Sequence, residues 1–177
     1  MRKIILYIAA SLDGKIARPD DNIDWLESFP NPDNNDYGYN RFLENIDTTL
    51  MGNNTYKVVL NMGIEFPYKN KTNYVFSREE KERDSNVIFI SKSIPEFVNK
   101  LKKQDGKDIW LIGGSEINTL FLNHHLINEI ILSTIPIVLG HGIPLFTDNT
   151  MEQSFEHDKT EIFKSGIIQS TYILKHE

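Results

Sequence analysis

Short, nearly continuous runs of hydrophobic residues recur along this chain and separate segments of mixed character. Such runs are typical of strands that are covered on both faces, as in the sheets of α/β proteins. Two later segments alternate between hydrophobic and polar positions, and Ser165-Gly166 between them predicts a turn, so we expect an antiparallel hairpin there. The predicted buried strands are residues 4–10, 49–51, 73–76, 87–90, 109–112 and 129–135, and the hairpin strands are 154–163 and 168–174.

Helical patterns fall between the predicted strands. A stripe of hydrophobic side chains from Phe42, Leu43 and Ile46 predicts an amphipathic helix over residues 37–46. Another helix, over residues 115–122, follows the double glycine that ends the strand at 109–112. Alternation of strands with helices, closed by a hairpin, predicts an α/β protein with a mainly parallel sheet and an antiparallel edge.

Two serines mark further helix starts. Ser77 and Ser93 are each followed by glutamate three residues later, which is the spacing of a capping box. At the second of these, Pro95 stands in the first turn, where proline is favoured. The pattern therefore predicts a helix that runs through residues 97–103, and a second helix start at Ser77.

Composition limits the class of protein. A length of 177 residues suits one domain, so we expect a single domain over residues 1–177, and 40% hydrophobic with 25% charged residues is ordinary for globular proteins. The absence of cysteine excludes disulfides, thiolate zinc sites, iron–sulfur clusters and a cysteine nucleophile. Ser11, Asp13 and Lys15 interrupt the first hydrophobic run too early for a membrane span or a signal peptide. We therefore expect a cytoplasmic protein without a membrane contact.

The charge balance restricts the partners. A formal net charge of −6 and a pI near 5.4 argue against nucleic-acid binding, which needs a cationic face. A small anionic ligand is compatible with an acidic protein, because backbone N–H groups can bind phosphate. His124-His125 has no nearby carboxylates, so we expect a solvated loop and no metal site, while His141 between two glycines is a weak candidate for a ligand contact.

Three junctions between a predicted strand and the next segment are suited to phosphate binding. Gly113-Gly114 lets the backbone pass close to a ligand, and the following helix directs free N–H groups at it. Gly52 stands in the same position before a helix start that contains asparagine and threonine. At the third junction, Ser77 and Arg78 offer a hydroxyl and a guanidinium for charge-assisted hydrogen bonds to a phosphate.

Each junction also has a purely structural interpretation: a tight turn, an asparagine helix cap, or a cap beside a solvated arginine. In an open α/β sheet, however, ligands bind beyond the carboxyl ends of the strands, where all three junctions lie. They can therefore converge on one dinucleotide. Neither the Gly-x-Gly-x-x-Gly fingerprint nor a phosphate loop ending in Gly-Lys-Ser/Thr is present in the sequence.

Five short motifs, in this order, resemble the dihydrofolate-reductase superfamily, and particularly the reductase domain of the bifunctional riboflavin-biosynthesis deaminase/reductase family. They are Ser-Leu-Asp-Gly-Lys-Ile within residues 8–17, Asp-Trp-Leu at 24–26, Leu-Met-Gly-Asn-Asn-Thr-Tyr at 50–56, Ile-Gly-Gly at 112–114 and Pro-x-x-x-Gly-x-Gly-x-Pro-Leu-Phe at 136–146. The first and last motifs favour the riboflavin-type branch over the folate enzymes. The resemblance covers nearly the whole chain and implies a three-layer fold with helices on both faces of a mixed sheet.

The resemblance implies NADPH as the hydride donor. Carried over residue by residue, it implies that Ala10 and Ile16 line the nicotinamide pocket and that Ile23 lies in the loop that closes over it. It implies that the pyrophosphate and the adenosine ribose are met by Gly52, Asn53, Asn54 and Thr55, and that the adenosine 2′-phosphate is faced by Ser77 and Arg78. It also implies that the pyrophosphate is held by Gly113, Gly114, Ser115 and Glu116, across a cis Gly-Gly bond. Many members of the family have arginine where Asn53 stands, and that arginine helps to select NADP. Arg78 is the candidate to replace it.

The substrate side rests on fewer residues. The folate enzymes use one buried carboxylate to steer a proton, and counting back from Met51-Gly52 places Asp36 at that position. Asp36 has an equally good structural interpretation as the cap of the following helix. Ser133 falls where the folate enzymes keep a threonine that bonds the carboxylate. Trp25 either packs over the substrate entrance or fills core.

These observations leave three hypotheses. The first is an NADPH-dependent reductase of a ribosylated aminopyrimidine, which is the reductase reaction of riboflavin biosynthesis. The deaminase of that pathway needs a zinc site with cysteine ligands, which this sequence cannot supply, so the reductase would act beside a separate deaminase. The second is a reductase of dihydrofolate or another pterin, which the Asp36 assignment would favour. The third is a nucleotide-binding protein of the same fold without turnover. The resemblance also implies a homodimer.

Overall fold

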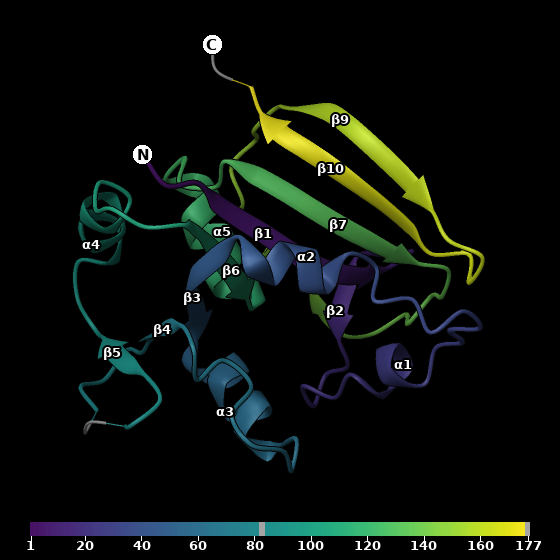
Figure 1. Ribbon diagram of the computed structural model, residues 1–177, viewed down its shortest axis with the longest axis horizontal. Coiled ribbons are helices and arrows are strands. Elements are labelled where there is room, and N and C mark those ends of the chain that lie inside the picture. The colour runs from purple at the N-terminus through teal and green to yellow at the C-terminus, as the bar shows by residue number, and fades with distance from the viewer. Residues whose placement is uncertain (82–83, 176–177) are drawn as a thin grey trace.

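One long twisted sheet organises the structure, a computed structural model that describes residues 1–81 and 84–175 (Figure 1). Within these residues, eight strands form the sheet in the order β5-β4-β3-β6-β1-β7-β10-β9. Two short strands, β2 (Lys15–Ala17) and β8 (Ile143–Pro144), pair separately. The strands of the large sheet are β1 (Ile4–Ser11), β3 (Ile46–Gly52), β4 (Thr72–Phe76), β5 (Ile88–Ile90), β6 (Asp108–Gly113), β7 (Glu129–Ile135), β9 (Phe155–Ile162) and β10 (Ile168–Leu174).

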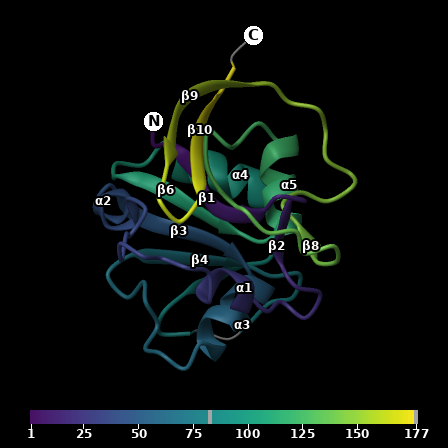
Figure 2. The same cartoon turned by 90° about the vertical axis from the view of Figure 1, so that its right-hand side faces the viewer.

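The sheet is parallel from β5 to β7, and β10 and β9 add an antiparallel hairpin at one edge. The predicted α/β fold with a mainly parallel sheet is therefore confirmed. Helices α4 and α5 pack on one face, and α2 and α3 on the other (Figure 2). The helices are α1 (Asp24–Glu27), α2 (Tyr39–Glu44), α3 (Asn53–Asn61), α4 (Ile94–Leu101) and α5 (Ser115–Asn123). Among the described helices, none is long and apolar enough to cross a membrane.

Each face of the sheet builds its own core, because successive side chains of a strand point to opposite faces. Toward α4 and α5, the side chains of Leu6, Leu50 and Leu111 lie on three neighbouring strands and are 0% exposed. They belong to one cluster with Val98 of α4 and Phe121 of α5. This cluster fixes α5 against the strand that immediately precedes it.

Trp110 is the centre of an aromatic cluster on the opposite face. Its ring centroid lies 5.3 Å from that of Tyr68, 5.6 Å from Phe42, 5.7 Å from Tyr39 and 6.5 Å from Tyr7, with the rings nearly perpendicular. Edge-to-face contacts of this kind are favourable beyond the area that they bury. The Trp110 Nε1–H also donates to the Tyr7 carbonyl at 3.1 Å. The cluster holds α2 against β1 and β6.

The predicted helix over residues 37–46 is wrong at its end. Helix α2 stops at Glu44, and Ile46 opens β3, where it pairs with Asp108 of β6 and is 3% exposed. A buried isoleucine fits a helical stripe and a strand equally well, and pairing with β6 decided between them. Strand β3 is correspondingly longer than the predicted residues 49–51.

The two capping boxes are not formed as predicted. Ser77 starts no helix within the described residues 77–81. Ser93 does precede a helix, but its φ of 49° is left-handed, and it makes no capping hydrogen bond to the described residues. Helix α4 begins at Ile94 with Pro95 in its first turn, as the pattern predicted, and ends at Leu101, before the predicted residue 103. Helix α5 extends one residue beyond the predicted 115–122.

Replacing Leu111 with alanine should lower the free energy of unfolding by about 2–5 kcal/mol, because it opens a cavity at the centre of the sheet. Urea unfolding followed by circular dichroism measures this change. Leu60→Ala, at a position on α3 that is 45% exposed, is the matched control and should have a much smaller effect. Equal effects of the two variants would contradict the placement of Leu111 in the core.

Candidate functional site

The three phosphate-binding junctions proposed from the sequence lie side by side. Strands β4, β3 and β6 are neighbours in the sheet and run parallel, so their carboxyl ends face the same edge. In register, Gly52 at the end of β3 pairs with Phe76 at the end of β4, and Met51 pairs with Gly113 at the end of β6. The chain therefore leaves all three strands at nearly the same level.

Glycine allows the first two junctions to touch. A Cβ added to Gly52 would lie 3.1 Å from the Ile117 Cγ1 atom of α5, and one added to Gly114 would lie 3.3 Å from the Thr55 Oγ1 atom of α3. Gly113 has a φ of 111°, which is unfavourable for any other residue. The peptide bond between Gly113 and Gly114 is cis, as the resemblance implied.

Helices α3 and α5 both begin at this point without a side-chain cap. Their N-cap residues are Gly52 and Gly114, which carry no capping group, so the first N–H groups of both helices are free to bind an anion. Two buried polar atoms, the Asn53 Oδ1 and the Ser115 Oγ, have no hydrogen-bond partner within residues 1–81 and 84–175. Because buried polar atoms are rarely left unpaired, these two atoms are suited to bind a polar ligand.

The third junction contacts the first through an ion pair. The buried Ser77 hydroxyl accepts a hydrogen bond from the Glu79 N–H at 3.3 Å. The Arg78 guanidinium donates to both carboxylate oxygens of Glu116, at 2.9 and 2.7 Å. Glu116 lies in the first turn of α5, so residues after β4 and after β6 meet at one place.

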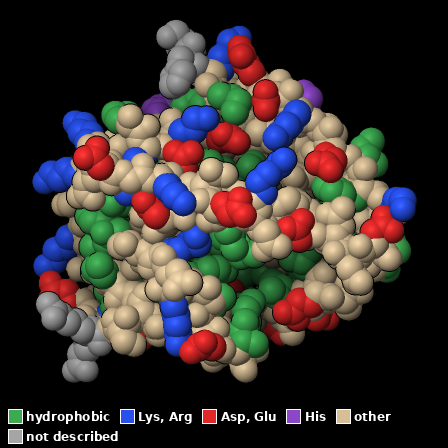
Figure 3. Space-filling view, in the orientation of Figure 1, with side chains coloured by type: hydrophobic (Ala, Val, Ile, Leu, Met, Phe, Trp, Pro, Cys, Tyr) green, Lys and Arg blue, Asp and Glu red, His purple; other side chains and the backbone are tan. Residues whose placement is uncertain are grey.

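A hollow lined by hydrophobic side chains opens below α2, between α3 and α1 (Figure 3). Strand β2, which carries Ile16, lies between α2 and α1 in the same view (Figure 1). Ala10, near the end of β1, is 3% exposed, and Ile16 is half-buried. A hydrophobic recess beside the phosphate-binding edge is the environment that an uncharged ring requires.

Asp13 fastens two loops at this end of the sheet, a function that the sequence analysis missed. Its carboxylate accepts hydrogen bonds from the Ser11 hydroxyl at 2.7 Å and from the N–H groups of Leu139 and Gly140, both at 2.9 Å. These bonds, led by the one from Leu139, lower the pKa of Asp13 to about 2. The signal in the sequence was the pair Asp13-Gly14, which is typical of a structured turn.

Asp36 lies in a different environment from the buried one predicted for it. Its carboxylate is exposed and accepts hydrogen bonds from the Gly38 N–H at 3.0 Å and the Asn40 N–H at 3.1 Å. These bonds, that from Asn40 first, hold its pKa below the ordinary value. A proton-steering carboxylate needs burial that raises its pKa, so the structure supports the alternative, a cap at the start of α2.

Trp25 fills core rather than facing an entrance. It is 3% exposed and packs with Ile135 of β7 and with Ile167. Its Nε1–H has no hydrogen-bond partner among the residues described. Of the two roles considered for Trp25, the structure shows the packing role.

Ser133 belongs to a side-chain network that sequence reasoning did not find. The Gln169 Nε2 group of β10 lies 3.0 Å from the Ser133 Oγ, 3.1 Å from the Tyr37 carbonyl and 3.3 Å from the Tyr7 hydroxyl. The Tyr7 hydroxyl donates to the Tyr37 carbonyl at 3.0 Å, and burial raises its pKa. Ser133 is thus bonded to Gln169 and not to Asp36. Cross-strand position alone links Gln169 to Ser133, and the sequence carries no motif for it.

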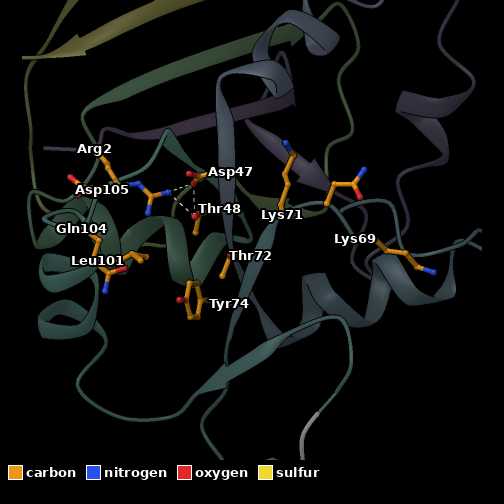
Figure 4. Close-up of a pocket in the computed structure, with 11 residues that line it drawn as sticks. Arg2, Asp47, Thr48, Lys69, Lys71, Thr72, Tyr74, Leu101, Gln104 and Asp105 are labelled. Atoms are coloured by element: carbon orange, nitrogen blue, oxygen red, sulfur yellow. Dashed lines mark hydrogen bonds and ion pairs between the residues drawn. The ribbon is translucent and has the colours of Figure 1, made fainter.

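A second, polar cavity lies at the amino-terminal ends of β3 and β4, opposite the strand ends described above (Figure 4). It has a volume of about 530 Å³ and is lined by Thr48 near the start of β3, Thr72 at the start of β4, and Arg2. The Arg2 guanidinium is already bonded to Asp47 and Thr48. Because it lies at the starts of β3 and β4, this cavity is separate from the strand ends at Gly52, Phe76 and Gly113.

In the described part of the chain, no three His, Cys, Asp or Glu side chains lie together as a metal site would require. The His125 Nδ1 atom lies 2.6 Å from the Gln153 Nε2, and His141 is exposed.

Comparison with known proteins agrees with this geometry. The family model for the RibD C-terminal domain matches residues 2–169. The uncharacterized protein YwjB of Bacillus subtilis (strain 168) is 40% identical over 167 residues, covering 94% of this chain and 95% of YwjB. A structure from Shewanella sp. PV-4, provisionally named a riboflavin biosynthesis protein, has a TM-score of 0.88 at 33% identity and covers 99% of this chain and 100% of its own.

A more distant structure shows the fold alone. Dihydrofolate reductase from Enterococcus faecalis, complexed with NADP(H), has a TM-score of 0.70 at 15% identity, covering 98% of this chain and 97% of that enzyme. The sheet order and this likeness thus define a dihydrofolate-reductase-like fold. The chain belongs to the RibD C-terminal domain family, and the resemblance seen in its motifs is confirmed.

The Asp13 contacts predict a pH dependence of stability. Because its folded pKa is about 2, below the unfolded value of roughly 3.9, its contribution is present above about pH 4 and is lost as the pH falls toward 2. Asp13→Asn should therefore lower the urea midpoint at pH 7, with a difference from the wild type that shrinks at acid pH. Glu152→Gln, an exposed carboxylate, is the control. A difference that grows on acidification would exclude this role for Asp13.

Proposed function

We propose that this protein is an NADPH-dependent reductase of the riboflavin-biosynthesis type, which reduces a ribosylated aminopyrimidine. The observation that carries the proposal is the meeting of two uncapped helix N-termini, of α3 and α5, over Gly52 and Gly114. Free N–H groups and the unpaired hydroxyl of buried Ser115 suit a pyrophosphate. Membership of the RibD C-terminal domain family supports the pyrimidine substrate.

The residues present fit a phosphorylated dinucleotide along its whole length. When bound, NADPH would supply the hydride. Glycine at the strand ends lets the starts of α3 and α5 approach each other, so that the free N–H groups of both helices can serve one pyrophosphate. The residues proposed to hold it are Gly52, Asn53, Asn54, Thr55, Gly113, Gly114, Ser115 and Glu116 at the pyrophosphate, Ser77 and Arg78 at the adenosine end, and Ala10, Ile16 and Ile23 around the nicotinamide.

The remaining groups of the site orient and shield the reactants. Asp13 holds the turn after β1 against Leu139 and Gly140, so both segments stay fixed beside the nicotinamide pocket. The hydrophobic hollow excludes water from the ring (Figure 3). Holding the donor and acceptor rings in fixed geometry would contribute to such catalysis, because it replaces a bimolecular encounter.

The exposure of Asp36 favours a pyrimidine over dihydrofolate as the substrate. Reduction of a pterin in the manner of the folate enzymes needs a buried proton-steering carboxylate, and Asp36 is solvated and ionised. The 177 residues contain no cysteine, so they cannot themselves hold the cysteine-dependent zinc site of a deaminase. A homodimer and a cytoplasmic location remain predictions.

Nucleotide titration followed by turnover tests this proposal. NADPH fluorescence should shift on binding at micromolar protein, while NADH should bind more weakly. Loss of absorbance at the NADPH band is then followed with the ribosylaminopyrimidine and, separately, with dihydrofolate. Turnover of the pyrimidine alone supports the proposal. Turnover of dihydrofolate alone would make dihydrofolate the substrate in place of the pyrimidine. Binding of NADPH without turnover of either would indicate a nucleotide-binding protein.

Ser115→Ala should weaken NADPH binding without destabilising the fold. The hydroxyl has no protein partner in the described structure, so its removal leaves no group unpaired. A lost hydrogen bond to a charged ligand is worth about 1.5–3 kcal/mol, or roughly 10- to 100-fold in affinity. Ser170→Ala, on the hairpin, is the matched control and should bind NADPH like the wild type. An unchanged affinity in Ser115→Ala would remove that residue from the site.

Asp36→Asn should change kcat by less than about twofold, because the carboxylate only caps α2. Removal of a proton-transfer group would instead reduce the rate by roughly 10²–10⁴. Steady-state rates of Asp36→Asn and of Asp33→Asn, an exposed position in the same loop, measure the difference. A large loss confined to Asp36→Asn would restore its catalytic assignment.

A further inference from the structure

The ion pair between Arg78 and Glu116 lies across the edge where the dinucleotide is proposed to bind. Arg78 follows β4, and Glu116 lies in the first turn of α5 after β6. Since β3 runs between β4 and β6 in the sheet, the pair bridges the two strands that flank the Gly52 junction. It makes two hydrogen bonds, at 2.7 and 2.9 Å, and both side chains are largely exposed, at 85% and 71%.

Within the described residues, Arg78 is a cation that these junctions offer to a phosphate directly after a strand end. The helix start after β3 carries the uncharged residues Asn53, Asn54 and Thr55. Lys92, farther along the chain, is itself paired with Glu80 at 3.0 Å. With Arg78 bonded to Glu116, the charge that would select a phosphorylated ribose is neutralised.

We infer that Glu116 determines cofactor specificity by competing with the ribose phosphate of the dinucleotide for Arg78. The inference rests on the proposed function. An exposed ion pair is weak, whereas a phosphate dianion makes stronger, bidentate bonds to a guanidinium. A dinucleotide with a 2′-phosphate therefore displaces Glu116 and gains Arg78. A dinucleotide without that phosphate leaves the pair intact and binds through the helix N-termini alone.

If Glu116 competes with the phosphate, its replacement changes nucleotide affinity in a way that replacing a residue that merely holds α5 in place would not. Removing the carboxylate frees Arg78 for the phosphate, so it should improve binding of NADPH more than binding of NADH. A general effect of negative charge on the pyrophosphate would improve both by the same factor. The coupling also requires Arg78, and so it must vanish when Arg78 is replaced.

Isothermal titration of NADPH and NADH into four proteins tests this: the wild type, Glu116→Gln, Arg78→Gln and the double variant. Glu116→Gln should bind NADPH about 2- to 5-fold more tightly with little change for NADH, as expected from the strength of an exposed pair. Arg78→Gln should lower the preference for NADPH. In the Arg78→Gln background, Glu116→Gln should no longer change that preference.

Glu65→Gln is the matched control, because Glu65 also forms an exposed pair, with Lys69, and its replacement removes one negative charge. It should leave both affinities unchanged. Equal tightening of NADPH and NADH by Glu116→Gln, or a persistent effect without Arg78, would overturn the inference while leaving the proposed function intact. Failure of the wild type to bind either nucleotide would overturn both.

Discussion

The space left by glycine at the ends of β3 and β6 is the constraint on which the site depends. Because Gly52 and Gly114 carry no side chain, α3 and α5 begin within contact distance of each other, and their free N–H groups face one point. The leucine core beneath α5 and the aromatic cluster around Trp110 hold the two strands in register. Core packing and ligand binding are thus coupled through the same two strands.

The two halves of the proposed site use different groups of the protein: backbone N–H groups in one half and side chains in the other. The half proposed to bind phosphate uses backbone N–H groups, whose positions follow from the fold and tolerate substitution of neighbouring side chains. The proposed substrate residue Ser133 depends on side chains instead, because it shares one hydrogen-bond network with Gln169 and Tyr7. A fold of this kind can keep one cofactor while its substrates change, because altering Gln169 or Ser133 leaves the strand ends untouched.

The sequence predicted what depends on local pattern and missed what depends on tertiary pairing. Hydrophobic runs located the strands, and glycine after a strand marked the junctions that meet at one edge of the sheet. Ile46 was assigned to a helix because its place beside β6 is not visible in a local pattern. The choice between the two roles considered for Asp36 could not be made from the sequence for a related reason, since burial is a property of the assembled loop. The contact between Arg78 and Glu116 joins residues far apart in the chain, and no spacing rule could reveal it.

Asp13 also restricts how this protein can change in evolution, because its carboxylate is bonded to two loops. The turn after β1 and the segment around Leu139 are joined by this carboxylate and by the backbone hydrogen bond from the Leu12 N–H to the Ile137 carbonyl, so neither can be lengthened or redirected independently of the other. Insertions are therefore better tolerated elsewhere, such as in the exposed loop before α2. A family with this attachment would diversify its substrate entrance by varying that loop, while the segments joined at Asp13 change together or not at all.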